Sequence, residues 1–279
     1  MSFTVAKADG ATEEFNPKKL LHSLERAGAN DDIAHAILNK VEHDYAHEHK
    51  NNIITTHEIY AQAFHELRNH KRPVAARYSL KRAVLDFGPS GFPFEAYVAD
   101  LFAHQGYAYK LDQHVRGACV EHEVDIVLEK DGITTFVEAK FHNSAGFKSD
   151  LKTALYVEAR MEDLRAADHK NARGLLVTNT KFTDAALEYA SCKLLDLLSW
   201  DYPQGRTLHD LIDEAKAYPV TALTSLSRRE KTALLEAKIV LANQLGGSGD
   251  ALGAAGVTGH KAEVVLEEAA ALCSGAGVL

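Results

Sequence analysis

The sequence predicts a multidomain chain of α+β and α/β type, and three observations lead to this reading. Asp9-Gly10 and Asp131-Gly132 each separate two short runs of β-forming residues, which is the pattern of a tight hairpin turn. Helical periodicity follows each hairpin, and after residue 202 it is the dominant pattern. The sequence therefore divides into three segments, which cover residues 1–90, 91–202 and 203–279.

The amino-terminal segment is expected to be a hairpin followed by helices. Its two strands are Phe3–Ala8 and Ala11–Phe15. Asn16 can cap the next helix, with Pro17 at the first position, where no amide hydrogen is needed. Gly28 ends that helix. Further helices are expected over Asp32–Glu48, over Thr56–Asn69 and after Pro73.

The central segment alternates helices and strands around the hairpin EVDIVLEKDGITTFVEAKF, Glu123 to Phe141. Before the hairpin we expect a helix over Phe94–Gln105 and a strand over Tyr107–Val115. After it come a helix over Leu151–Ala166, a strand over Gly174–Asn179, a helix over Thr183–Cys192 and a strand over Leu194–Leu198. The carboxyl-terminal segment is a small helical region, with helices over Leu208–Ala217, Ser227–Gln244 and Lys261–Leu272.

The central hairpin gathers charged side chains on one face. If the turn is tight, Lys130 pairs with Ile133, and the same register places Asp125 opposite Glu138. Because side chains alternate along a strand, Asp125, Glu138 and Lys140 then share one face. Directly opposed residues have Cβ atoms about 4.5–5.5 Å apart, so two carboxylates can hold one cation there.

These three residues suit metal-assisted attack on a phosphate. Paired carboxylates favour Mg²⁺ or Mn²⁺, which keeps several waters and takes further ligands from phosphate. A neighbouring ammonium such as that of Lys140 orients the nucleophile or stabilises the transition state. The alternative is a solvated strand face on which opposite charges pair across the ladder.

The segments FPFEAYVADLF, HEVDIV and FVEAKFHN occur in this order and resemble the PD-(D/E)xK nuclease fold, specifically Mrr-like (type IV) restriction endonuclease domains. The resemblance spans roughly Gly91 to Trp200 and implies an αβββαβ core. It implies catalytic roles for Glu95, Asp125, Glu138 and Lys140, with the three acidic residues as metal ligands. His142 and Arg160 are either phosphate contacts or ordinary surface residues.

The segments VAKADGATEEFNPKKL, TTHEIY and VAARYSLKRA resemble the ATP-cone, a nucleotide-sensing module found at the start of many ribonucleotide reductases. The resemblance implies ATP or dATP as an effector. It assigns nucleotide contacts to Val5, Lys7, Glu13, Asn16, Lys19, Thr56 and Tyr60. Ala8 stands where the family has an arginine, so one phosphate partner is missing from the motif.

Composition sets further bounds. The net charge of -8 argues against a chain that coats nucleic acid indiscriminately. Three scattered cysteines do not support a disulfide framework or a zinc site. The start of the chain has no apolar signal core, and no run approaches the ~20 residues that span a bilayer. We therefore expect a cytoplasmic protein with no membrane partner.

Together these patterns predict a metal-dependent DNA endonuclease, regulated by adenine nucleotide and acting as a homo-oligomer. The alternative is a non-enzymatic, ATP- or dATP-responsive DNA-binding regulator, but regulators that carry an ATP-cone also have a zinc ribbon, which needs paired cysteines. In the tail, LGAAGVTGHKAEVVLEEA (residues 252–269) faintly resembles a helix-hairpin-helix, and an oligomerisation module fits equally well. DNA versus RNA, sequence specificity and the sign of the ATP effect stay open.

Overall fold

The computed structural model describes residues 3–7, 10–48, 53–88, 90–247 and 249–274. The chain folds into two compact units, where the sequence suggested three segments. One unit is continuous, from Val84 to Ala217. The other combines the chain up to Ala83 with the chain from Tyr218 onward. The amino-terminal segment and most of the tail therefore belong to one body.

The discontinuous unit begins with a small sheet in the strand order β2-β1-β3. β1 (Thr4–Ala6) and β2 (Thr12–Glu14) form the predicted antiparallel hairpin, with Val5 opposite Glu13. Ala8 and Asp9 of the connecting turn lie outside the described residues. β3 (Ile54–Thr55) lies parallel to β1 and was not predicted, because a two-residue strand has no readable period.

Five helices follow the hairpin and form the core of this unit with the sheet. They are α1 (Pro17–Arg26), α2 (Asp31–Glu48), α3 (Thr56–His70), α4 (Arg72–Tyr78) and α5 (Leu80–Leu85). The Asn16 side chain accepts a hydrogen bond from the Lys18 amide, which confirms the predicted cap. Thr55 and Glu58 cap α3 reciprocally, so each satisfies an amide that the helix leaves unpaired. α1 is buried at Leu20 and Leu24.

The continuous unit is built on a mixed five-stranded sheet of strand order β10-β8-β6-β5-β4. β5 pairs antiparallel with β4 and with β6, whereas β8 pairs parallel with β6 and with β10. The strands span Ala108–Arg116 (β4), Glu121–Lys130 (β5), Ile133–Lys140 (β6), Arg173–Thr178 (β8) and Asp196–Leu198 (β10). A short parallel pair, β7 (Lys148–Ser149) and β9 (Lys181–Phe182), adds a second small sheet that was not predicted.

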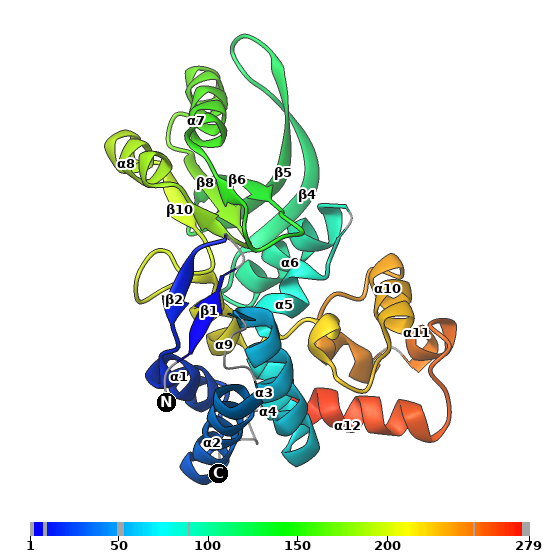
Figure 1. The fold of residues 1–279 in the computed structure, drawn as a ribbon. Helices are drawn as coiled ribbons and strands as arrows, with labels where there is room; N and C mark the ends of the chain where they lie inside the picture. Colours follow the sequence, from blue (N-terminus) through cyan, green and yellow to red (C-terminus); the bar gives the residue numbers. More distant parts are fainter. Residues whose placement is uncertain (1–2, 8–9, 49–52, 89, 248, 275–279) are drawn as a thin grey trace. The chain divides into compact units, whose positions relative to one another are not determined.

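Helices cover both faces of the central sheet. They are α6 (Phe92–Ala103), α7 (Leu151–Ala166), α8 (Asp184–Lys193) and α9 (Leu208–Ala215). α7 and α8 pack together on one face, while α6 packs against β4, β5 and β6 on the other (Figure 1). The order α6-β4-β5-β6-α7-β8 is the predicted αβββαβ core.

The turn between β5 and β6 has the predicted geometry. Asp131 and Gly132 both adopt positive φ, 52° and 76°, as a type I′ turn requires. Lys130 pairs with Ile133, and the predicted register continues to Ile126 opposite Val137. The expected core face, which includes Val124 and Leu128, is buried.

The tail differs from its prediction in the middle. The expected single helix over Ser227–Gln244 is wrong, because α10 (Arg228–Glu236) ends and Lys238 turns the chain at φ 61°. The Val220 amide donates to the Val240 carbonyl oxygen at 2.9 Å, so the chain folds back on itself. The remaining elements are η1 (Val220–Ala222), η2 (Ala242–Gly247), α11 (Gly249–Ala254) and α12 (His260–Ser274).

Tertiary contacts tie this tail to the amino-terminal helices of the same unit. α12 packs against α4, and the Thr221 hydroxyl donates to the Ala83 carbonyl oxygen at 2.7 Å. Glu268 is buried and accepts four hydrogen bonds, from the amides and hydroxyls of Thr224 and Ser225. No helix among the described residues is long and apolar enough to cross a bilayer.

Candidate active site and nucleotide pocket

Asp125 sits at a local break in the sheet. The β4–β5 ladder pairs Leu111 with Ile126 and Gln113 with Val124, but it omits the pair between them, Asp112 and Asp125. Asp112 adopts φ 50°, which is uncommon outside glycine and is best tolerated by Asp and Asn. The break frees Asp125 to turn toward β6, where its Oδ2 accepts the Ala139 amide at 2.7 Å.

This geometry corrects the predicted register at the site. The β5–β6 ladder ends at Ile126 opposite Val137, so Asp125 opposite Glu138 and Glu123 opposite Lys140 are not ladder pairs. Asp125 still interacts with Glu138, because the Glu138 charge raises the pKa of Asp125. The two carboxylates therefore share one site through side-chain placement rather than through strand pairing.

Glu138 is held by an arginine that reaches it from α7. Arg160 Nη1 lies 2.8 Å from Glu138 Oε2, and the exposed fractions of the two side chains are 7% and 17%. Burial, the largest single influence, lowers the pKa of Arg160, but the charges and hydrogen bonds of Glu138 and Tyr156 together raise it above its ordinary value, so the guanidinium stays charged. The Arg160 guanidinium also lies 4.8 Å from the centre of the Tyr156 ring. Arg160 is thus a buried site residue and not the surface residue of the alternative reading.

Glu95 contributes a further carboxylate from the first turn of α6. Burial, and then the charges of Asp125, Asp112, Glu138 and Glu123, raise the pKa of Glu95 to about 7. Burial and the Glu138 charge raise the pKa of Asp125 to about 6, against an opposing hydrogen bond from Ala139. The structure therefore brings the predicted acidic residues close enough to resist one another's ionisation.

Lys140 is the last residue of β6, and His142 follows it by two positions. Lys140 is exposed and pairs in register with Thr178 of β8. Burial, followed by the Lys140 charge, lowers the pKa of His142. Its ring lies 3.1 Å from the Ser149 hydroxyl, and its backbone is clamped by Asn179, which accepts from the His142 amide at 2.8 Å and donates to its carbonyl oxygen at 2.7 Å. The sequence did not single out Asn179, because its role depends on the β6–β8 pairing.

The donor set fits a hard divalent cation that completes its coordination elsewhere. Among the residues that the structure describes, no group of three or more Asp, Glu, His or Cys side chains is gathered as a ready metal site. Glu138 Oε2, however, is buried without an aligned hydrogen bond, and the raised pKa values of Asp125 and Glu95 indicate that burial and neighbouring negative charges outweigh the cationic charge of Arg160. Mg²⁺ suits this arrangement, because it retains waters and takes phosphate oxygens as ligands.

A second candidate site is a pocket of about 160 Å³ beside the amino-terminal hairpin. Six of the seven predicted nucleotide residues line it: Val5, Glu13, Asn16, Lys19, Thr56 and Tyr60. Lys7 does not line the pocket. Its Nζ instead lies 2.6 Å from one carboxylate oxygen of the pocket residue Glu13, and Lys19 Nζ lies 2.9 Å from the other oxygen. One Glu13 carboxylate therefore pairs with two lysines, which leaves a net positive charge beside the pocket.

An aromatic stack forms one side of the pocket. The Tyr60 and Tyr78 rings are stacked 5.4 Å apart, and both residues line the cavity. Arg82 lies over the Tyr60 ring, 5.8 Å from its centre, and its Nη1 is 3.0 Å from His57 Nδ1. Arg82 brings a positive charge to the pocket edge that the predicted set did not include. Arg82 follows Tyr78 by four residues, about one helical turn, across the break between α4 and α5.

Three family descriptions match this chain. "ATP cone domain" matches residues 3–85, "Restriction endonuclease" matches residues 89–201, and "AF1548-like, C-terminal" matches residues 218–273. The first two matches confirm the two resemblances drawn from the sequence. The third covers the part of the tail that folds with the amino-terminal unit.

Individual relatives cover a large part of the chain. An uncharacterised protein of Archaeoglobus fulgidus is 33% identical over 173 residues, which are 62% of this chain and 97% of the relative. A crystal structure described as a protein of unknown function, AF1548, is 32% identical, covers 66% of this chain and 99% of its own, and has a TM-score of 0.55. A repair endonuclease from Pyrococcus abyssi is 22% identical over 37% of this chain and 45% of its own, with a TM-score of 0.30.

Proposed function

The chain belongs to the AF1548-like family and combines an ATP-cone with a restriction endonuclease domain, and from this premise we propose that it is a metal-dependent DNA endonuclease regulated by adenine nucleotide. One observation carries the proposal above the others. Burial and the charges of Asp125 and Glu138 raise the pKa of Glu95, burial and the Glu138 charge raise the pKa of Asp125, and the buried Arg160 pairs with Glu138 at 2.8 Å. A merely structural sheet edge has no need of such an arrangement.

The proposed chemistry is hydrolysis of a phosphodiester bond. Asp125 and Glu138, with Glu95, would hold Mg²⁺, which when bound lowers the pKa of a water and offsets phosphate charge. Without a bound cation, burial and the neighbouring carboxylate charges raise the pKa of Glu95 to about 7, so a cation held at this site would favour its ionised form. Lys140 stands on the exposed strand end and can orient that water or stabilise the charge that develops on the phosphate.

Arg160 has a separate part in this proposal. It neutralises Glu138 in the metal-free protein, with Nη1 at 2.8 Å and Nε buried without a partner. The planar guanidinium offers several donors, so it can keep one contact with Glu138 and give another to a phosphate oxygen. We therefore assign Arg160 to phosphate binding and to holding Glu138 in place.

A plasmid-cleavage assay with purified protein tests the nuclease proposal. Lys140→Ala is expected to reduce Mg²⁺-dependent cleavage by about 10²–10³-fold, as loss of one charge-stabilising donor does. Lys170→Ala is the matched control: Lys170 is exposed and lies near the start of β8, at the opposite end of the sheet. Cleavage by Lys140→Ala at the wild-type rate would contradict the assignment. An RNA substrate in parallel decides between the two nucleic acids.

The competing function, a DNA-binding regulator without catalysis, is an explicit outcome of the same assay. It predicts DNA binding that responds to ATP or dATP, with no cleavage by the wild type in Mg²⁺ or Mn²⁺. The ATP-cone supports either function, because its pocket is built independently of the catalytic residues. The carboxylate cluster favours the enzyme, because a binding surface for DNA gains nothing from three neighbouring negative charges.

Nucleotide binding is tested by calorimetry with ATP and dATP on the full chain. Lys19→Ala removes a lysine that lines the pocket and pairs with Glu13. Lys40→Ala is the matched control, since Lys40 also pairs with a glutamate, Glu66 at 2.7 Å, but does not line the pocket. We expect weaker binding only in Lys19→Ala, because a charge-assisted phosphate contact is lost. Equal affinity in both variants would place the nucleotide elsewhere.

A further inference from the structure

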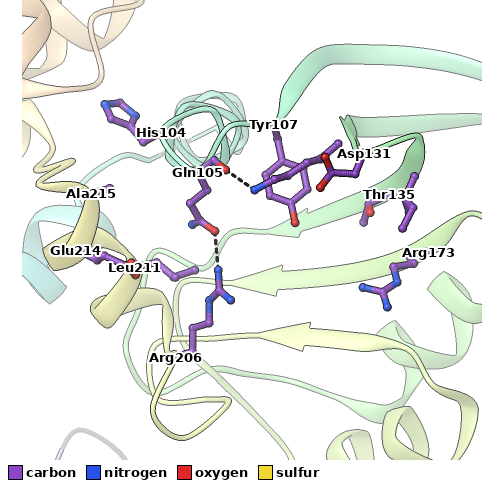
Figure 2. A pocket seen from close by; sticks show the side chains of 12 residues that line it. His104, Gln105, Tyr107, Asp131, Thr135, Arg173, Arg206, Leu211, Glu214 and Ala215 are labelled. Atoms are coloured by element: carbon purple, nitrogen blue, oxygen red, sulfur yellow. Dashed lines mark hydrogen bonds between the residues drawn. The ribbon is translucent and has the colours of Figure 1, made fainter.

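The continuous unit contains another cavity, of about 650 Å³, that the proposed reaction does not use. It lies where the β5–β6 turn, the start of β8, the end of α6 and the helix α9 meet (Figure 2). None of the catalytic residues lines it. Asp125 and Lys130 are five positions apart on β5, which is about 17 Å at ~3.4 Å per residue. The cavity is therefore a separate site.

Three cations from three different elements reach this cavity. Lys130 ends β5, Arg173 begins β8, and Arg206 precedes α9. Figure 2 shows the guanidinium groups of Arg173 and Arg206 extending into the same space. Arg173 has no hydrogen-bond or ion-pair partner in the described part of the chain. The three cations outnumber the two carboxylates that line the same cavity, so the lining is net positive and favours an anion.

Gln105 holds two of these cations in fixed positions. Its backbone carbonyl oxygen accepts from Lys130 Nζ at 2.6 Å, and its side-chain Oε1 accepts from Arg206 Nη2 at 2.9 Å. Lys130 also lies 4.9 Å from the centre of the Tyr107 ring. Gln105 Nε2 is buried and has no hydrogen-bond partner, so the wall carries one more unused donor. Donors that are already positioned reduce the cost of ordering when a ligand binds.

The rest of the lining favours a small ligand that carries both a negative charge and hydroxyl groups. Asp131 and Glu214 also face the cavity, and they would repel a bare polyanion but accept hydrogen bonds from hydroxyl groups. A volume of about 650 Å³ suits a ligand of nucleotide size. We propose that this cavity binds a nucleotide through its terminal phosphate, held by Arg173 and Arg206, with ribose hydroxyls facing the carboxylates. The nucleotide is either free or the phosphorylated end of a nucleic-acid strand.

Calorimetry on the full chain, with EDTA present and in a Lys19→Ala background to weaken the ATP-cone site, tests this proposal. The probes are inorganic phosphate, AMP, and a short single-stranded oligonucleotide with and without a 5′-phosphate. Arg173→Ala is expected to weaken binding of the phosphorylated probes about tenfold or more, because a charge-assisted contact is lost. Lys170→Ala removes a nearby positive charge that does not line the cavity and should leave binding unchanged.

Arg206→Ala is the second variant and should weaken binding in the same way. Trp200 fluorescence confirms that each variant is folded, since this single tryptophan lies in the continuous unit. Binding of AMP identifies a free nucleotide as ligand, whereas binding of the 5′-phosphorylated oligonucleotide alone identifies a strand end. The proposal is overturned if no probe binds at millimolar concentration, or if Arg173→Ala binds as tightly as its parent. Loss of binding in Lys140→Ala with none in Arg173→Ala would place the phosphate at the catalytic residues instead.

Discussion

Replacing Asp125 by asparagine is expected to stabilise the metal-free protein at pH 8. Asp125 carries a charge that burial and Glu138 oppose, and its pKa rises from 3.8 to about 6. Its folded pKa is therefore above its unfolded pKa, so the folded state binds more protons between these values. The contribution of protonated Asp125 to the free energy of unfolding is fully present below about pH 4 and is lost as the pH rises through about 6. Asparagine removes the charge and can still accept the Ala139 amide.

The size of the stability gain in Asp125→Asn follows from the rise in the pKa of Asp125. About two pKa units correspond to about 3 kcal/mol, and partial exposure of the side chain reduces this to about 1–2 kcal/mol. The gain should be complete at pH 8 and nearly absent at pH 4. The pKa of Glu95 is also raised, to about 7. Ionisation of Glu95 therefore also lowers the free energy of unfolding as the pH rises toward neutrality, in the wild type and in Asp125→Asn.

Urea unfolding followed by Trp200 fluorescence measures this difference in the continuous unit. Asp168→Asn is the control, because Asp168 is an exposed aspartate of the same unit. Added Mg²⁺ should stabilise the wild type by mass action and leave Asp125→Asn nearly unchanged. The reasoning fails if Asp125→Asn is no more stable than the wild type at pH 8, or if its gain is the same at pH 4.

Three further outcomes are expected. Gly174→Ala should lower the free energy of unfolding by about 1–3 kcal/mol by overpacking, since a Cβ there would lie 2.7 Å from Met161 Cγ, and an unchanged urea midpoint would contradict it. Glu268→Ala should cost about 1–3 kcal/mol in the discontinuous unit, because it leaves the buried donors of Thr224 and Ser225 unpaired; thermal unfolding by circular dichroism measures this, and an unaltered melt would refute the packing described. Light scattering should show an oligomer whose size responds to ATP, because a double-strand cut needs two sites in fixed relation, and a monomer in both conditions would exclude that arrangement.

Local patterns predicted the elements well and the long-range contacts poorly. Asp131-Gly132 determined the hairpin turn and its register, because both residues tolerate positive φ and the strands beside them alternate. The helix predicted over Leu151–Ala166 begins and ends at these residues in the structure. The break at Asp112 and Asp125 was not predictable, because it depends on how three strands and α6 accommodate one carboxylate.

The same limit applies to the site and the tail. The sequence left Arg160 as either a phosphate contact or a surface residue, and only the packing of α7 on the sheet shows that it reaches Glu138. In the tail, where an oligomerisation module was one reading of the sequence, the apolar residues Leu223, Leu226, Leu234 and Val240 are buried in their own unit. The sequence has no signal for this difference, since an apolar stripe looks the same whether a neighbouring chain or its own unit covers it.

The unit that contains the restriction endonuclease match is an insertion within the other unit, since the chain leaves the discontinuous unit at Ala83 and returns to it at Tyr218. Two covalent connections, rather than one linker, therefore join the candidate nucleotide pocket to the candidate catalytic residues. A single proteolytic cut at either connection leaves both units attached to each other through the remaining one. A fragment that ends near residue 90 keeps the nucleotide pocket but loses α12, which packs against α4, and the Thr221 contact with Ala83. Truncation studies of the ATP-cone should accordingly excise the middle of the chain and join its two flanks.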